Sequence, residues 1–349
     1  MATTKFEAFL NQFDEKAWLE AVAALLPEIH EVDRNGVQIW FRFYPLSLFR
    51  YLETAENKEE AIRKFVLQGK YELKDQIDES HKFLYGHRFW RETRDAIVNH
   101  AEDFHTENAD FKTEVRAIAK TVAQSAKTTE CLGVGIVLVG LMTLVQVGFD
   151  RFKAAQGKVF IDGRLAKKSA KEVLAERARD DSQGLFGFLK TVDKKFTVRY
   201  DETDANAKFR IINEEEIASA AARDQSRNWL EKDARCIEGV IPVECRSAAC
   251  GTCWVGVLGG QEKLSEVSRL ERKQVKIFGY NQPEEPKPFL RLACQAKVYG
   301  NATIVIPPWN GVFGKKVYGN VEEAELEPAT TSAKANRTIV REATKNQLM

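Results

Sequence analysis

The chain has 349 residues, enough for two domains, and its 52 Lys and Arg residues are balanced by 51 Asp and Glu residues. This balance gives no argument for a nucleic-acid partner, and we expect none. Six cysteines in a chain of this length argue against a disulfide scaffold and favour a reducing compartment. The N-terminus reaches Glu7 without an apolar run, so we expect no signal peptide.

Residues 1–156 are predicted to form an all-helical domain, because apolar residues recur at helical spacing from Phe6 onward. Asn35–Gly36 is typical of a turn. The aromatic segment 37–49 is expected to belong to the core, the alternative being an aromatic surface for a flat cofactor or a partner. An amphipathic helix is predicted over 110–126, with one apolar face made of Phe111, Val115, Ile118 and Val122.

All five histidines lie in this half: His30, His81, His87, His100 and His105. Glu102 and His105 form one Glu-x-x-His element, whereas a di-iron bundle needs two. Two histidines could ligate a b-type haem, but nothing in their spacing requires it. We therefore expect ordinary hydrogen-bonded histidines, and leave open whether any of them binds a second cofactor.

The run 131–149 contains no charged residue and is long enough to span a bilayer. Basic residues are denser after it than before it, so a span would leave the C-terminal part in the cytoplasm. That orientation would export the N-terminal domain without a signal peptide. We favour the other interpretation, a central helix buried by its neighbours, and leave membrane association through 131–149 open.

The segment 157–194 is predicted to be a charged connector, with a short strand at 158–163, a helix at 165–178 and charges that face solvent. A second domain is predicted over 195–310. It is expected to hold a hairpin (196–200 and 207–212), a helix (214–230), a strand (254–258), a helix (265–275) and a closing hairpin (295–299 and 303–306). The polar tail 311–349 is predicted to be disordered.

Four cysteines in this second domain follow the spacing C-x4-C-x2-C with a distant fourth, namely Cys245, Cys250, Cys253 and Cys294. This is the plant-type spacing for a [2Fe–2S] cluster held by four thiolates. A zinc site would show paired C-x2-C elements or nearby histidines. The loop residues between the first three cysteines are expected to contact the cluster, namely Arg246, Ser247, Ala248, Ala249, Gly251 and Thr252. All of them except Arg246 have small side chains, which let backbone N–H groups turn toward the sulfurs. Cys131 and Cys236 are not expected to be ligands.

The segments 243–253, 291–295 and 303–308 together resemble the plant-type [2Fe–2S] ferredoxin family and the ferredoxin domains of larger oxidoreductases. The resemblance covers only the C-terminal third of the chain, and the N-terminal half is not recognised. It implies an α+β organisation, in which an all-helical N-terminal domain precedes a β-grasp ferredoxin-like domain. Two departures are a long gap before Cys294, with an insertion at 265–288, and an extended approach to Cys245 that carries Cys236.

A cluster held by four cysteines has no open coordination position and moves one electron. The sequence therefore predicts a one-electron carrier or relay that exchanges electrons with redox partner proteins, a reductase and an acceptor, while the helical domain docks. The alternatives are an iron–sulfur subunit of a larger oxidoreductase, with its membrane association left open, and a cluster-based redox sensor. A self-contained flavin reductase is disfavoured, because the N-terminal half is too short and too helical. We expect a cytoplasmic protein, with any membrane association on the cytoplasmic side.

Overall fold

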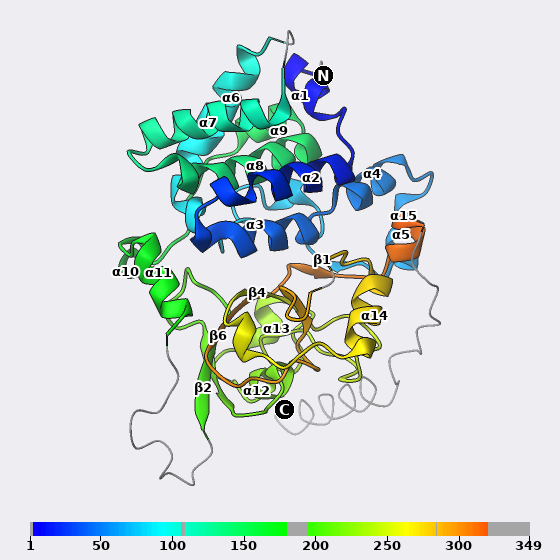
Figure 1. Cartoon of the computed structure of the whole chain (residues 1–349). Coiled ribbons are helices and arrows are strands. Elements are labelled where there is room, and N and C mark those ends of the chain that lie inside the picture. The colour runs from blue at the N-terminus through cyan, green and yellow to red at the C-terminus, as the bar shows by residue number, and fades with distance from the viewer. Residues whose placement is uncertain (1–2, 106–108, 180–193, 284, 320–349) are drawn as a thin grey trace, which may run out of the picture. The chain divides into compact units, whose positions relative to one another are not determined.

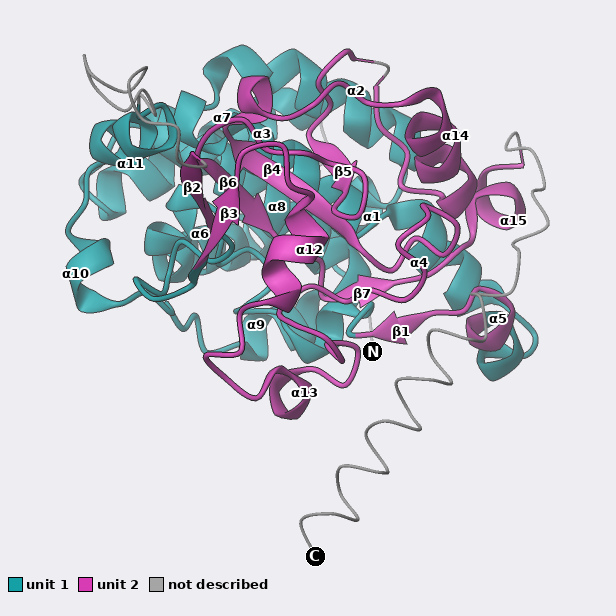
Figure 2. Cartoon of the chain, turned by 90° about the horizontal axis from the view of Figure 1, so that it is seen from below, with its two compact units in different colours: residues 1–61, 70–179, 199–208 teal, residues 62–69, 180–198, 209–349 magenta. Residues whose placement is uncertain are grey.

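The computed structural model of the chain describes residues 3–105, 109–179, 194–283 and 285–319 (Figure 1). Helices dominate the N-terminal part and a mixed sheet lies in the C-terminal part, which confirms the predicted α+β organisation. The chain divides into two compact units (Figure 2). Unit 1 comprises 1–61, 70–179 and 199–208, and unit 2 comprises 62–69, 180–198 and 209–349. Each unit combines three separate ranges of the chain, so the units do not test the domain boundaries predicted from the sequence, which remain predictions.

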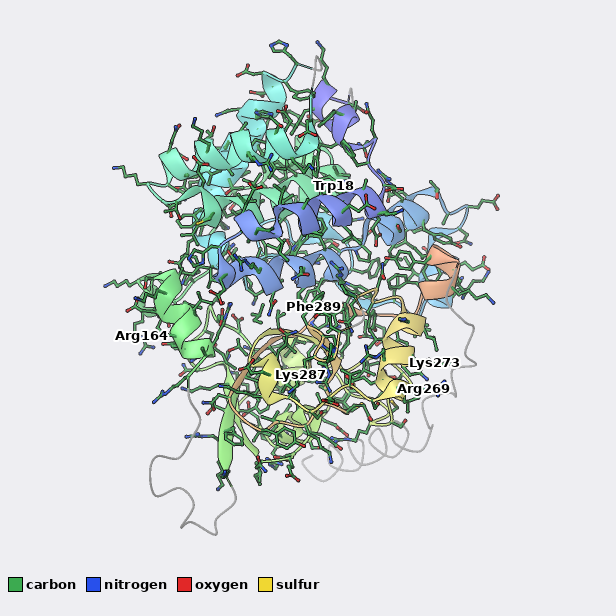
Figure 3. The ribbon with its side chains drawn as sticks, viewed as in Figure 1. Trp18, Arg164, Arg269, Lys273, Lys287 and Phe289 are labelled. Atoms are coloured by element: carbon green, nitrogen blue, oxygen red, sulfur yellow. The ribbon has the colours of Figure 1, made fainter. Side chains whose placement is uncertain are left out.

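Unit 1 is built around helix α8 (Glu130–Val147), which packs against α3, α6 and α7 (Figure 1). Trp18 on α2 is fully buried in this unit (Figure 3). The helices of unit 1 besides α8 are α1 (Lys5–Leu10), α2 (Glu15–Leu25), α3 (Glu31–Phe43), α4 (Leu46–Thr54), α6 (Trp90–Glu102), α7 (Phe111–Ser125), α9 (Phe149–Ala154), α10 (Gly163–Ala166) and α11 (Ala170–Arg177). Helix α5 (Lys58–Lys64) begins in unit 1 and ends in unit 2.

Helix α8 is long and apolar enough to cross a membrane, yet 83% of it is buried inside the protein's own fold. Its glycines allow this burial, because a Cβ at Gly133 would lie 3.2 Å from the carbonyl oxygen of Ala119 on α7. Helix α7 itself begins after its N-cap Asp110 and buries the four predicted apolar residues. The described residues thus contain no clear membrane span, and the interpretation of 131–149 as a buried helix is favoured.

The aromatic segment 37–49 lies mostly in α3 and α4 and is largely buried, which confirms that it belongs to the core. The turn predicted at Asn35–Gly36 is wrong, because α3 continues through both residues and Gly36 is buried. Tertiary packing has overridden a weak local preference.

The strand predicted at 158–163 is also wrong. The N–H of Phe160 donates to Nε2 of His87 instead of joining a ladder, at 3.0 Å. The helix predicted over 165–178 is two helices, α10 and α11, because Ser169 forms a capping box that starts α11 anew. The charges of the connector are not all solvated: Arg177 is buried and forms an ion pair with Glu202 at 2.6 Å. The rest of the connector, 180–193, lies outside the described residues.

Unit 2 contains a five-stranded sheet with the order β3-β2-β6-β4-β5. Its strands are β2 (Lys195–Arg199), β3 (Lys208–Ile212), β4 (Trp254–Gly259), β5 (Leu290–Leu292) and β6 (Ala302–Val305). A second, two-stranded sheet pairs β1 (Gln68–Gly69) with β7 (Trp309–Asn310), so a segment of the N-terminal half contributes to this unit. The helices are α12 (Ile217–Ala222), α13 (Trp229–Lys232), α14 (Arg269–Phe278) and α15 (Gly314–Tyr318). Arg269 and Lys273 lie on α14 (Figure 3) and are exposed.

The predicted hairpin of β2 and β3 and the strand β4 are confirmed. The long helix predicted over 214–230 is wrong: α12 ends at Ala222 and only the short α13 follows. The closing hairpin is wrong in one arm. Residues 295–299 make isolated bridges from Lys297 and Val298, whereas β6 pairs with β4. The predicted tail begins too early, since β7 and α15 extend the fold to Tyr318, and 320–349 lies outside the described residues.

Candidate metal centre

The loop 245–253 has no helix or strand and turns through three residues with positive φ: Arg246 (57°), Ala248 (63°) and Gly251 (70°). Left-handed backbone is uncommon for residues with a Cβ, so the surrounding structure must hold it. Left-handed residues alternating with residues of ordinary backbone turn successive N–H groups toward one side of the loop. The result is a concavity of the kind that binds anions and iron–sulfur clusters. The small side chains of this loop allow it to be compact.

The loop brings the four predicted cysteine ligands together as two pairs. The Cys245 and Cys250 thiols share a hydrogen bond, and so do those of Cys253 and Cys294. The pairs are also neighbours, because Cys250 acts electrostatically on Cys253. Cys253 and Cys294 are each 2% exposed, whereas Cys245 and Cys250 are partly exposed. One pair thus lies inside unit 2 and the other nearer its surface.

The sheet sets the position of Cys294. Antiparallel pairing places Trp254 opposite Leu292, so the residues that follow Cys253 and precede Cys294 are neighbours. The N–H of Ala293 donates to the carbonyl of Cys253 at 2.9 Å, which extends this pairing up to the ligands. Cys294, which is far from Cys253 in the sequence, therefore lies beside it in the structure.

A buried ion pair fixes the same segment from the other side. The carboxylate of Glu271 on α14 accepts from Nε of Arg291 at 2.9 Å and from the N–H of Leu292 at 2.8 Å. Both charged side chains are 1% exposed. Helix α14, which belongs to the predicted insertion, is therefore part of the framework of the site.

Hydrogen-bond donors approach the sulfurs at close range. The N–H of Ser247 donates to Cys245 at 3.4 Å, and a bond of 3.2 Å joins the Thr252 hydroxyl to Cys250. Gln295 Nε2 lies 3.5 Å from the Cys294 sulfur, which also accepts from the backbone of Ala248.

The other predicted loop residues play different parts. The Arg246 side chain pairs with Glu238 at 2.6 Å. Ala248 is 1% exposed, Ala249 is half-buried, and Ser247 is exposed. Gly251 leaves no room for a side chain, because a Cβ would lie 2.8 Å from the ring of Phe278.

These hydrogen bonds divide each pair into one acidic and one weakly acidic thiol. The bond from Cys250 lowers the pKa of Cys245 to about 4, and the same bond, with burial, raises the pKa of Cys250. The bond from Cys253 lowers the pKa of Cys294, while that bond and burial raise the pKa of Cys253. The thiolate is the metal-binding form, and the hydrogen bonds that Cys245 and Cys294 accept favour that form.

The donor set fits a binuclear cluster. Each iron of a [2Fe–2S] cluster takes two thiolates, and the structure supplies two adjacent pairs. In the described residues, no group of three or more His, Cys, Asp or Glu side chains could hold a single metal ion. Cys236 is buried, and its thiol donates to the carbonyl of Val240 at 3.1 Å, while burial raises its pKa to about 12. Cys131 lies in unit 1, beside Thr129.

The histidines of unit 1 have other partners. His30 caps α3, His100 bonds Glu114 at 2.7 Å, and His81 and His87 bond each other at 2.9 Å. His105 is exposed. Their positions reveal no second group of metal ligands in the described part of the chain.

The sequence pattern missed several residues that surround the loop, namely Glu271, Phe278, Tyr280 and Gln295. The first three belong to the segment that the ferredoxin resemblance treats as an insertion, so no motif marks them. Gln295 directly follows the last cysteine and lies within the matched segment 291–295, so the resemblance marked its position but not its contact with the Cys294 sulfur.

Residues 214–299 match the family model of the 2Fe-2S iron-sulfur cluster binding domain. The match includes all four paired cysteines and does not extend to the N-terminal half. No solved structure matches the chain. The C-terminal part of this protein therefore contains a ferredoxin-type iron–sulfur domain that binds one [2Fe–2S] cluster.

Proposed function

We propose that the protein is a one-electron carrier or relay in which Cys245, Cys250, Cys253 and Cys294 hold the cluster. The observation that carries this proposal is the arrangement of four thiols as two adjacent pairs within the matched domain. By this assignment Cys245 and Cys250 would hold one iron and Cys253 and Cys294 the other. When bound, the cluster supplies a one-electron couple, and the reduction potential of plant-type centres is about −400 mV.

The protein's own residues fix the cysteines and control access to them. The sheet and α14 position Cys253 and Cys294 and exclude water from that pair. The partly exposed Cys245 and the exposed Ser247 mark the edge where a redox partner can approach. Backbone N–H groups of the loop stabilise the negative charge of the sulfurs, which sets the potential.

The helical unit has its own core around α8 and is proposed to dock the reductase or the acceptor. The burial of α8 within its own unit supports a carrier over a membrane-embedded subunit. The iron–sulfur subunit of a larger oxidoreductase is the main alternative, and a redox sensor is another.

The test is anaerobic purification of the full chain followed by iron and sulfide analysis and EPR after reduction. We expect about two irons and two sulfides per chain and one S = 1/2 signal. Changing any of the four ligands to Ala should abolish or severely destabilise the cluster, whereas the double variant C131A/C236A should retain it. Stoichiometric zinc without visible absorption would refute the proposal, and cluster loss in the double variant would refute the ligand assignment.

A further inference from the structure

Tyr280 lies just after α14 and is 1% exposed. Its ring stacks on that of Trp254, the residue after Cys253, with centroids 3.8 Å apart and planes inclined by 16°. Its hydroxyl lies 2.8 Å from the carbonyl oxygen of Gly251 and 3.1 Å from that of Gly311. The ring is thus fixed by packing, and the hydroxyl reaches a carbonyl of the cluster loop.

The bond to Gly251 acts on a peptide that touches a ligand. The N–H of the Gly251–Thr252 peptide belongs to Thr252, which lies beside the sulfur of Cys250. The Thr252 hydroxyl is 3.2 Å from that sulfur, and the Thr252 backbone acts to lower the pKa of the Cys250 thiol. The described chain has no cis peptide, so the C=O and N–H of this unit point in opposite directions. Tyr280 therefore holds one end of a peptide whose other end reaches the Cys250 sulfur.

This geometry has an electrostatic consequence. A donor on the carbonyl polarises the peptide and strengthens its N–H as a donor, as in hydrogen-bond chains generally. Reduction adds one negative charge to the cluster and its sulfurs. An N–H bond to sulfur therefore stabilises the reduced form more than the oxidised form and raises the potential.

We propose that Tyr280 is a positioning residue that raises the reduction potential of the [2Fe–2S] cluster through the Gly251–Thr252 peptide. The inference rests on the proposed assignment of Cys250 as a ligand. It gives the segment 265–288 a role in the electron transfer itself. A simple packing role would require the ring of Tyr280 but not its hydroxyl.

The variant Y280F separates these two roles, because it keeps the ring that stacks on Trp254 and removes only the hydroxyl. Potentiometric titration of the full-length holoprotein, followed by EPR of the reduced cluster, measures the effect. We expect about a threefold lower ratio of reduced to oxidised cluster at a fixed ambient potential. At 59 mV per tenfold for one electron, this is a shift of about −28 mV. The matched control is Y299F, since Tyr299 is an exposed tyrosine of the same unit.

For a second variant we expect a shift of the reduction potential in the opposite direction. Site-specific replacement of Tyr280 by 3-fluorotyrosine keeps the hydroxyl and makes it a stronger donor, so the potential should rise above that of the wild type. This measurement remains decisive if Y280F does not fold.

An intact cluster with an unchanged potential in Y280F would overturn the proposal. A folded Y280F that cannot retain its cluster would also overturn it, because Tyr280 would then be framework only. Failure of the proposed function is distinguishable, since the wild type would then lack the [2Fe–2S] signal, or C250A would keep it.

Discussion

The buried ion pair between Glu271 and Arg291 offers a direct test of how the fold holds the fourth cysteine. Glu271 accepts three hydrogen bonds, from Arg291 Nε at 2.9 Å, from Arg291 Nη2 at 3.1 Å and from the N–H of Leu292 at 2.8 Å. Arg291 and Leu292 lead straight into Cys294. The substitution E271A removes all three bonds and leaves the guanidinium buried without its counter-ion.

The expected cost follows from that burial. Both side chains are 1% exposed, so solvent neither screens the pair nor rescues the remaining charge. Removing one partner of a buried pair typically costs about 3–5 kcal/mol. At 1.36 kcal/mol per tenfold, the population of the opened segment should rise roughly a hundredfold or more. An exposed pair would cost about 1 kcal/mol at most.

The assay is the first-order loss of visible cluster absorption in the presence of an iron chelator. When opening is fast relative to capture, this rate follows the population of the open form. We expect E271A to lose its cluster roughly a hundredfold faster than the wild type. The double variant E271M/R291M should recover most of that loss, because apolar replacement of a buried pair is often neutral.

The control is E266A, which removes an exposed carboxylate from the loop that precedes α14. It should lose its cluster at the wild-type rate. An acceleration of less than about fivefold in E271A, corresponding to about 1 kcal/mol, would refute the reasoning, since the pair would then behave like one at the surface.

Three further predictions concern pH, the cluster loop and α8. Burial lowers the pKa of His87 to about 4 and that of His81 well below 6.5, so these two groups make the free energy of unfolding fall as pH drops from 6.5 toward 4. Burial raises the pKa of Asp33 to about 6, so this group makes the free energy of unfolding rise over the same pH range. The two histidines outweigh the one carboxyl, so chemical denaturation followed by helical circular dichroism should show the free energy of unfolding falling by about 1 kcal/mol per pH unit. The fall should be steeper in D33N, and a free energy that does not change with pH would contradict this prediction. G251A should lose its cluster, because the new Cβ would lie 2.8 Å from the ring of Phe278. The control G319A should keep it, because Gly319 has a similar φ but no neighbour within 4 Å of an added Cβ. Equal cluster retention in the two variants would exclude the clash as the cause. Carbonate washing of membranes should release the protein, because α8 is mostly buried, and retention until detergent is added would show a true span.

Local chemistry in the sequence was enough to identify the centre. The spacing of Cys245, Cys250 and Cys253 lies within one loop, and three ligands within nine residues impose small neighbours whatever the rest of the chain does. The helix α7 was predictable for a similar reason, since its N-cap and its apolar face are both local signals.

Predictions failed where distant residues decide the local structure. The Asn35–Gly36 pair is a turn signal by itself, but packing keeps α3 continuous there. The strand predicted around Phe160 is absent, because His87, far away in sequence, takes its N–H. The helix predicted after Glu214 stops early at Ala222, and no local pattern marked that end.

The tertiary structure alone decided what surrounds the cysteines. Sequence periodicity could not show that Glu271 on α14 lies against Arg291, or that Tyr280, just after α14, reaches the carbonyl of Gly251. Both contacts join segments about twenty to thirty residues apart through buried side chains. Nor could it show that Gln68 and Gly69 pair with β7. Ligand spacing is a property of one loop, whereas the hydrogen bonds that orient the loop arise only when the chain closes on itself.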